Sequence, residues 1–383
     1  MGGDARVEAS MSYWRSRLRR TGALLCACAI ACGALAGCRT ATATPSATPA
    51  PTTYKNAGVL ARNLASLGQV SGPVSGTIQT GSDTEKLSGT VSLNGHDSEV
   101  QITEAGSARQ LSDEIVVAGH RYTSPDNVIW IDRGAEPKGS SLAEALAGAA
   151  TTVDDGASTV GGVAAHEIVT PVDVVDMATA LGIDPWTFDH PSSVLRIWAD
   201  ASGKPLGFGA TMSWQVNLGG TEQDVAIDLD VPFIYTSPVE IAAPAKPWQW
   251  IDDQTSGLAL AVPSDWQRTT VNDAQGVTSY FGDNYTVGYT NVGNVGQASL
   301  SDETTQVVKA SVDQPSSPRT IVVGAENASL MTIHRSKQND YVVLVVILHE
   351  TLLYEILVIG SPDDSSGTDS LAAQVAATVE FTR

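Results

Sequence analysis

Cysteine is confined to one end of the chain. All four cysteines lie at or before residue 38 of 383, which excludes a disulfide framework or a cysteine-ligated zinc site from the rest of the sequence. Basic residues are also scarce, because 22 lysines and arginines face 42 aspartates and glutamates, for a formal charge of −20. A chain with this excess of negative charge repels phosphate backbones, so we expect no nucleic-acid partner.

Catalytic and metal-binding signatures are missing as well. The six histidines, at positions 96, 120, 166, 190, 334 and 349, never lie three or four residues apart, the spacing that places two metal ligands on one helical face. A Gly-x-Ser-x-Gly nucleophile motif is absent too. We therefore expect a protein that is not an enzyme and that holds no metal or cofactor. A hydrolase that uses residues outside these motifs is the catalytic alternative.

The first 38 residues have the pattern of an export signal. Four arginines between residues 15 and 20 precede an uncharged stretch, 21–37, which is shorter than the about 20 apolar residues of a membrane-spanning helix. The stretch ends in Leu35-Ala36-Gly37-Cys38, which resembles the lipobox of bacterial lipoproteins. That resemblance implies a signal peptide over 1–37, starting at Met1 or Met11, and a lipid group on the thiol of Cys38. An uncleaved signal anchor is the alternative.

The sequence after Cys38 predicts a spacer and two domains. Residues 38–53 contain three prolines and no large apolar side chain, which is typical of an extended linker. Removal of residues 1–37 takes away five basic and two acidic residues and leaves a body of charge −23, which anionic lipid head groups repel. We therefore expect attachment to the outer face of the cell membrane through acyl chains alone. A second proline-rich stretch, 238–247, separates predicted domains at 54–245 and 246–383.

The first predicted domain is mainly β. A helix is expected over 57–67 and short helices over 142–149 and 172–181, while residues 115–118 and 128–131 read as short strands. Towards the end of the domain, two long stretches alternate apolar and polar residues, as two strands of a half-buried antiparallel sheet do. Because few helices are available to cover the apolar face of such a sheet, we expect a curled sheet or an apolar groove that binds a lipid.

A family resemblance supports this interpretation. The sequence Ser-Val-Leu-Arg-Ile-Trp-Ala-Asp at 193–200, followed by Gly-Lys-Pro-Leu at 203–206, is similar to the LppX/LprG lipoproteins of actinobacteria over residues 54–236. The resemblance implies a LolA-like antiparallel half-barrel with a hydrophobic cavity for lipids or lipoglycans. The candidate cavity residues are Leu87, Val91, Val100, Ile102, Phe208, Met212, Trp214, Val225, Ile227 and Leu229. Ordinary core packing of the same residues is the alternative.

The second predicted domain combines strands with two helices. Helices are expected over 302–312 and 371–379, and the apolar stretches 341–348 and 352–359 predict a buried hairpin rather than a membrane span, because His349 and Glu350 interrupt them. Residues 363–369 are expected to form a solvated loop. The Pro263 to Trp266 turn after a strand is similar to the PsbP/Mog-type α/β/α fold, which implies a smaller sandwich that acts as an interaction module.

Together these observations predict an α+β lipoprotein of the cell envelope. It binds a lipid or lipoglycan in its N-terminal half-barrel and presents or transfers it, while the C-terminal domain contacts an envelope protein. The alternative function is a non-catalytic interaction or structural lipoprotein without a lipid cavity.

The lipid anchor can be tested with a single substitution. Cys38→Ser removes the thiol that the lipobox resemblance assigns to acylation, so the protein should appear in the culture medium. Partitioning between detergent and aqueous phases measures the change. Undiminished retention of the Cys38→Ser protein in the membrane fraction would show that the anchor lies elsewhere.

Overall fold

The computed structural model describes residues 52–106, 110–125, 128–137, 141–148, 153–183, 189–218, 221–235, 238–269, 276–311, 313, 315–323 and 326–382. The predicted signal peptide, Cys38 and linker residues 39–51 lie outside this part of the chain. The protein is mostly β, with 56% of residues in strands and five helices in the described ranges. Its large antiparallel sheets are not closed into a barrel, which agrees with the α+β class expected from the sequence.

The first half of the chain contains the elements up to residue 232. Its strands are β1 (Thr52–Thr53), β2 (Val70–Thr80), β3 (Asp83–Asn94), β4 (Asp97–Glu104), β5 (Gln110–Val117), β6 (His120–Thr123), β7 (Ile131–Ala135), β8 (Val153–Val160), β9 (Val163–Pro171), β10 (Asp189–Ala199), β11 (Pro205–Leu218) and β12 (Thr221–Pro232). Its helices are α2 (Ala57–Ala65), α3 (Leu142–Gly148) and α4 (Val174–Ala180).

The second half continues from residue 248. Its strands are β13 (Trp248–Asp253), β14 (Leu258–Pro263), β15 (Gln267–Thr269), β16 (Thr278–Gly282), β17 (Tyr285–Asn294), β18 (Arg319–Val323), β19 (Glu326–Arg335), β20 (Asp340–His349), β21 (Leu352–Gly360) and β22 (Glu380–Phe381). Its helices are α5 (Leu300–Ala310), the 3-10 turn η2 (Pro362–Asp364) and α6 (Ser365–Ala377).

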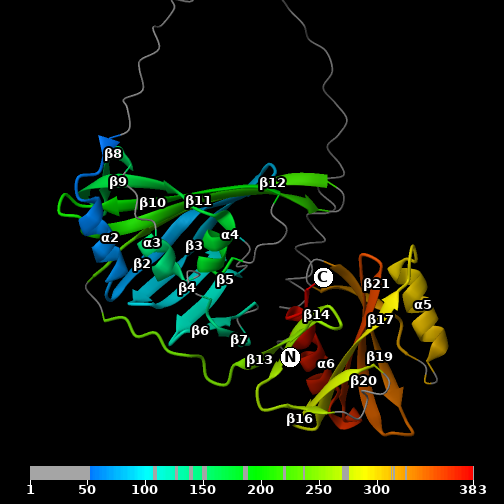
Figure 1. Ribbon diagram of the computed structural model, residues 1–383. Coiled ribbons are helices and arrows are strands. Elements are labelled where there is room, and N and C mark those ends of the chain that lie inside the picture. The colour runs from blue at the N-terminus through cyan, green and yellow to red at the C-terminus, as the bar shows by residue number, and fades with distance from the viewer. Residues whose placement is uncertain are drawn as a thin grey trace, which may run out of the picture. The chain divides into compact units, whose positions relative to one another are not determined.

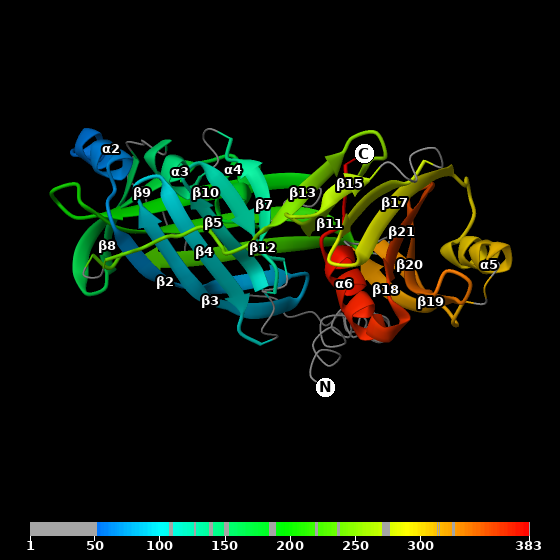
Figure 2. The same cartoon turned by 90° about the horizontal axis from the view of Figure 1, so that it is seen from below.

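The larger sheet runs in the order β8-β9-β10-β11-β12-β2-β3-β4-β5-β6-β7-β13-β14-β22. The last long strand of the first half, β12, pairs antiparallel with the first one, β2, so strands distant in sequence meet in the middle of the sheet. Strands β7 and β13 pair in parallel at two positions. Figure 1 shows the sheet curving around α3 and α4, and Figure 2 shows its strands from below.

Helix α2 is fixed by the hairpin turn between β10 and β11. The hydroxyl of Tyr54 donates to the carbonyl of Asp200 at 2.7 Å, and the amides of Asn56 and Asn63 donate to the carbonyls of Ala201 and Gly203 at 2.7 and 2.8 Å. The turn itself is closed by the Asp200 carboxylate, which accepts hydrogen bonds from residues 202 and 204. The Asp-x-x-Gly-x-Pro pattern, residues 200–205, therefore forms a turn whose backbone carbonyls bind the segment that contains α2.

The connection between the two halves packs on the outer face of the larger sheet. Val239 and Ile241 form a small apolar cluster with Ile115 and Tyr122 of β5 and β6. On the same face of β5 lies Asp113, which is buried, and burial raises the pKa of its carboxyl to about 6, with the charge of Glu99 adding to the shift. The predicted domain boundary near residue 246 stays a prediction.

The smaller sheet has the order β15-β16-β17-β21-β20-β19-β18. The predicted hairpin forms β20 and β21, which pair from Tyr341–Gly360 to His349–Leu352. Helices α5 and α6 lie on opposite sides of this sheet (Figure 1). Because α5 packs on the side of Leu344 and Val346, the alternating side chains of β20 have apolar contacts on both faces.

Several predicted elements differ from the structure. The loop expected over 363–369 was wrong: Pro362 to Asp364 form a 3-10 turn, and α6 begins at Ser365, capped by the Asp364 carboxylate. The strand expected over 128–131 begins only at Ile131 and extends to Ala135, while Val128 is exposed in a bend. Strands β8 and β9 were missed, because their many small and polar residues lack a strong apolar alternation.

The raised pKa of Asp113 makes a pH-dependent prediction. A carboxyl with a higher pKa in the folded than in the unfolded state destabilises the fold when it is ionised, so this penalty is present above about pH 6 and fades as the pH falls towards 4. Asp113→Asn should therefore raise the unfolding temperature by a few degrees at pH 7 and have no effect near pH 4. Glu99→Gln is the matched control and should give a smaller gain at pH 7. A loss of stability in Asp113→Asn at pH 7 would contradict the assignment.

Candidate functional site

The inner face of the larger sheet is built around β11 and β12. These strands pair in continuous register, so that Phe208 faces Val231, Met212 faces Ile227 and Trp214 faces Val225. Directly opposite residues in an antiparallel pair point to the same side of the sheet, and successive residues alternate between the two faces. The apolar half of both strands therefore forms one continuous surface, and the polar half, with Thr211 and Asp228, faces the other way.

Strands β2, β3 and β4 extend this surface. Ile227 of β12 pairs with Ile78 of β2, and Val91 of β3 pairs with Val100 of β4. All ten predicted cavity residues lie in a single apolar cluster, and each is no more than 8% exposed: Leu87, Val91, Val100, Ile102, Phe208, Met212, Trp214, Val225, Ile227 and Leu229. The structure thus brings the predicted residues together. A ligand cavity among them stays a prediction.

Three short helices cover the inner face. They belong to the same apolar cluster through Leu60 and Leu64 of α2, Leu142 and Leu146 of α3, and Met177 of α4. The helices have only nine, seven and seven residues, so their stability depends on packing against the sheet rather than on their own hydrogen bonds. These helices are predicted from the sequence, but their side chains are not among the predicted site residues, although the four-residue spacing of Leu142 and Leu146 indicates a shared apolar face.

Strand β5 brings polar groups to the inner face. Glu114 pairs with Val100 and Thr123, and it is 2% exposed. Its carboxylate accepts a hydrogen bond from Nε of Arg121 at 2.7 Å, and Nη2 of Arg121 donates to the carbonyl of Thr179 in α4 at 2.8 Å. Arg121, whose side chain is 18% exposed, therefore links the C-terminal end of α4 to the buried carboxylate of Glu114, and its positive charge also complements the helix dipole. We call Glu114, Arg121 and Thr179 the α4 clamp.

Gly182 allows α4 to approach the sheet at the clamp. Its φ is +64°, a conformation that residues with a Cβ rarely adopt. A Cβ at this position would lie 2.6 Å from Oγ of Ser112 and 2.8 Å from Cβ of Glu114. The end of α4 thus requires glycine for both its backbone conformation and the close packing.

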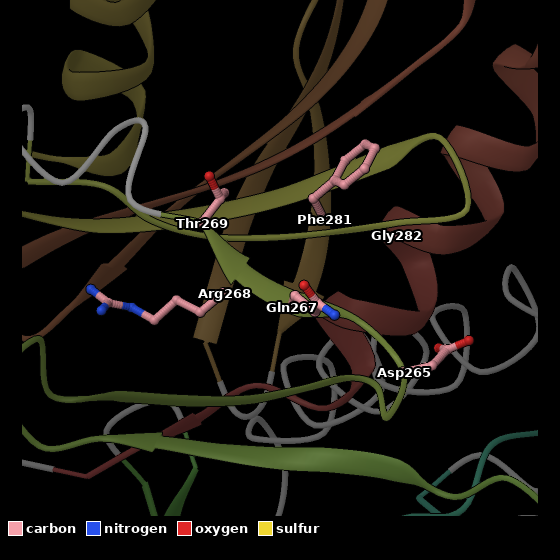
Figure 3. A pocket seen from close by; sticks show the side chains of 6 residues that line it. All are labelled: Asp265, Gln267, Arg268, Thr269, Phe281 and Gly282. Atoms are coloured by element: carbon pink, nitrogen blue, oxygen red, sulfur yellow. The ribbon is translucent and has the colours of Figure 1, made fainter.

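A separate open pocket of about 570 Å³ lies at the edge of the smaller sheet. Its lining residues are Asp265, Gln267, Arg268, Thr269, Phe281 and Gly282. Figure 3 shows that the side chains of Arg268, Thr269 and Asp265 point in different directions rather than to one point. The pocket therefore does not gather polar groups around a reacting atom.

Two of the histidines, His166 and His349, each lie beside a single carboxylate. Nδ1 of His166 lies 2.9 Å from Asp154, and Nδ1 of His349 lies 2.9 Å from Glu326 while its ring stacks on Phe381. Within the described ranges, no group of three or more histidine, cysteine, aspartate or glutamate side chains is arranged to hold a metal ion. In the same part of the chain, no helix has both the length and the apolar character needed to cross a membrane.

Comparisons with known proteins give structural neighbours only. No family model matches the sequence, and no curated protein matches it. Similar solved structures include cyanobacterial PsbP (CyanoP) from Synechocystis sp. PCC 6803, at 13% identity and a TM-score of 0.29, covering 38% of this chain and 98% of that one. Another is LprF from Mycobacterium bovis, at 11% identity and a TM-score of 0.26, covering 51% of this chain and 100% of that one.

The α4 clamp makes a prediction about stability. Arg121→Met removes the cation from the buried Glu114 carboxylate, and breaking one side of a buried pair costs about 3 kcal/mol of unfolding free energy. The double variant Glu114→Gln/Arg121→Met should recover most of this loss, because it leaves no buried charge. Denaturant unfolding of the two single variants and the double variant measures the coupling. Additive losses in the double variant would show that the pair does not act as a unit.

Proposed function

We propose that the chain is a lipid-anchored protein of the extracytoplasmic face of the cell membrane that binds an apolar ligand. The ligand is a lipid or lipoglycan, and its acyl chains lie between the half-barrel sheet and helices α2–α4. The protein presents or transfers this ligand without catalysing a reaction and without a cofactor. The C-terminal half, in an α/β/α layout, contacts an envelope protein.

The observation that carries the proposal is the cover of the inner face. An apolar surface that spans β11, β12, β2, β3 and β4 is closed by three helices of about two turns each, and α4 is attached at its end by a hydrogen bond from Arg121 and a tight glycine contact. Short helices with few anchoring contacts can move apart at a lower free-energy cost than sheet strands can. Acyl chains can replace their apolar contacts with the sheet.

The energetics of such a ligand are favourable. Burial of apolar surface stabilises a complex by about 25 cal/mol per Å², so a diacyl ligand that buries several hundred Å² gains about 10 kcal/mol before entropy costs. This gain requires no charged group, which suits an inner face dominated by leucine, isoleucine, valine and phenylalanine.

One observation favours the second candidate, an interaction or structural lipoprotein without a cavity. All ten candidate residues are buried in a single cluster, as residues of an ordinary packed core are. In that case the candidate contact site for a protein partner is the exposed Phe281, which borders the open pocket of the smaller sheet and offers an apolar side chain.

Ligand loading of the mature chain distinguishes the two functions. Native mass spectrometry of the protein from an actinobacterial host, followed by organic extraction, should show one bound lipid per chain. Met212→Trp should lower this loading with little change in melting temperature, because the larger side chain fills ligand space. Val292→Trp, at an exposed position of the smaller sheet, is the control and should keep the ligand.

The opposite pattern would support the packed-core function. An empty wild-type chain after incubation with envelope lipids would contradict the carrier proposal. In a packed core, Met212→Trp should also destabilise the fold by about 1–3 kcal/mol through overpacking.

A further inference from the structure

Positive and apolar side chains gather where the described chain begins. Arg62 is exposed on α2, and Lys55 is exposed just before this helix. Lys204 is exposed on the β10–β11 turn, and Ile234 and Tyr235 follow β12. Ile234 is 45% exposed and Tyr235 is 37% exposed. We call these five residues the α2-end patch. They come from three separate segments of the chain, so their proximity is a product of the fold.

Contacts between the three segments hold the patch together. The turn carries α2 through the hydrogen bonds from Asn56 and Asn63 described above. Nζ of Lys204 lies 4.1 Å above the ring of Tyr235, whose hydroxyl donates to the carbonyl of Pro205. The backbone N–H of Ile234 donates to the carbonyl of Ser71 at 2.6 Å. The exposed side chain of Ile234 therefore projects from an anchored backbone and not from a frayed end.

The charge of the patch is opposite to that of the whole chain. Three of the 22 basic residues belong to this patch in a chain of formal charge −20, and two carboxylates, those of Asp200 and Asp154, interact electrostatically with Tyr54 beside it. The carboxylate of Asp200, in the same turn, accepts hydrogen bonds from two backbone N–H groups and the Ser202 hydroxyl. Because exposed charges farther apart than about 8–10 Å are screened at physiological ionic strength, a nearby anionic surface experiences the local cations more than the distant acids.

The patch adjoins the end of the linker. The fifteen residues 39–53 separate Tyr54 from Cys38, and Lys55 directly follows Tyr54. Fifteen residues span at most about 50 Å when fully extended, so a lipid on Cys38 keeps this end of the sheet within that distance of the membrane. Lysine and tyrosine are also typical of the membrane–water interface, where an apolar ring or stem meets charged head groups.

We propose that the α2-end patch is a docking surface for the anionic head groups of a lipid bilayer. The three cations contact phosphate groups, and Ile234 and Tyr235 enter the interface between them. This contact sets which end of the first half faces the membrane. The proposal does not depend on a ligand inside the sheet, so either can fail without the other.

Vesicle binding by the unacylated chain tests the docking surface apart from the anchor. The mature chain with Cys38→Ser is mixed with vesicles of phosphatidylcholine alone, or of phosphatidylcholine and phosphatidylglycerol in equal amounts, and sedimented. We expect binding only to the anionic vesicles and a loss of binding at high salt. Each basic residue at an anionic surface strengthens binding about fivefold, so Lys55→Glu/Arg62→Glu/Lys204→Glu should weaken it about a hundredfold or more.

A second triple variant controls for net charge. Lys246→Glu/Lys309→Glu/Lys337→Glu changes the same number of exposed lysines or arginines elsewhere and should keep the binding. Equal losses in both variants would overturn the proposal in favour of a general charge effect. No binding of the parent chain to anionic vesicles would overturn it as well.

The absence of cysteine beyond residue 38 allows a direct readout of depth. Ile234→Cys in the Cys38→Ser chain, labelled with a polarity-sensitive fluorophore, should shift its emission to the blue when anionic vesicles are added. Val292→Cys, which places the label at another exposed β-branched position, should not respond. A response at residue 292 with none at residue 234 would place the membrane contact on another surface.

Discussion

The pairing of β11 with β12 determines which side chains the rest of the first half can bury. Twelve residue pairs run without a register shift from Gly207–Pro232 to Leu218–Thr221. A slip by one residue would turn the apolar side of one strand towards water and bring threonine and aspartate side chains inwards. The neighbouring strands and the three helices all pack against the surface that this register creates. The long unbroken pair is thus the constraint on which the inner face depends.

Polar contacts attach two of the covering helices, α2 and α4, at the margins of the inner face. At one margin, side chains of residues 54, 56 and 63 donate to carbonyls of the β10–β11 turn, and at another the guanidinium of Arg121 reaches the end of α4. Hydrogen bonds require specific geometry, whereas apolar contacts between helices and sheet do not. The position of the helices is therefore set by a few directional bonds, and their stability comes from apolar burial.

Much of this architecture could be predicted from the sequence, because apolar and polar residues alternate strongly in the segments that form β11 and β12. Residues 206–216 and 225–233 alternate clearly, and the β-branched stretches around His349 and Glu350 indicate a hairpin. The ten candidate site residues follow from the same periodicity. Strands β8 and β9 could not be predicted in this way, because glycine, alanine, serine and threonine give them little apolar contrast and their tight turn is Gly161-Gly162. The α4 clamp could not be predicted either, because Arg121 and Thr179 are 58 residues apart and no local pattern connects them.

The meeting of β2 with β12 has a consequence for how the protein is made. These two strands pair at six positions, and about 145 residues separate the partners Thr80 and Val225. Because a protein chain is synthesised from its N-terminus, β2 and β3 are complete long before their neighbour β12 is available. Pairing between distant segments is slow, because the ends of a long loop must first come together. During that interval the apolar side chains of β2 and β3 stay exposed to water, and strands in this state are prone to aggregation until synthesis passes residue 230 and β12 can cover the edge of β2.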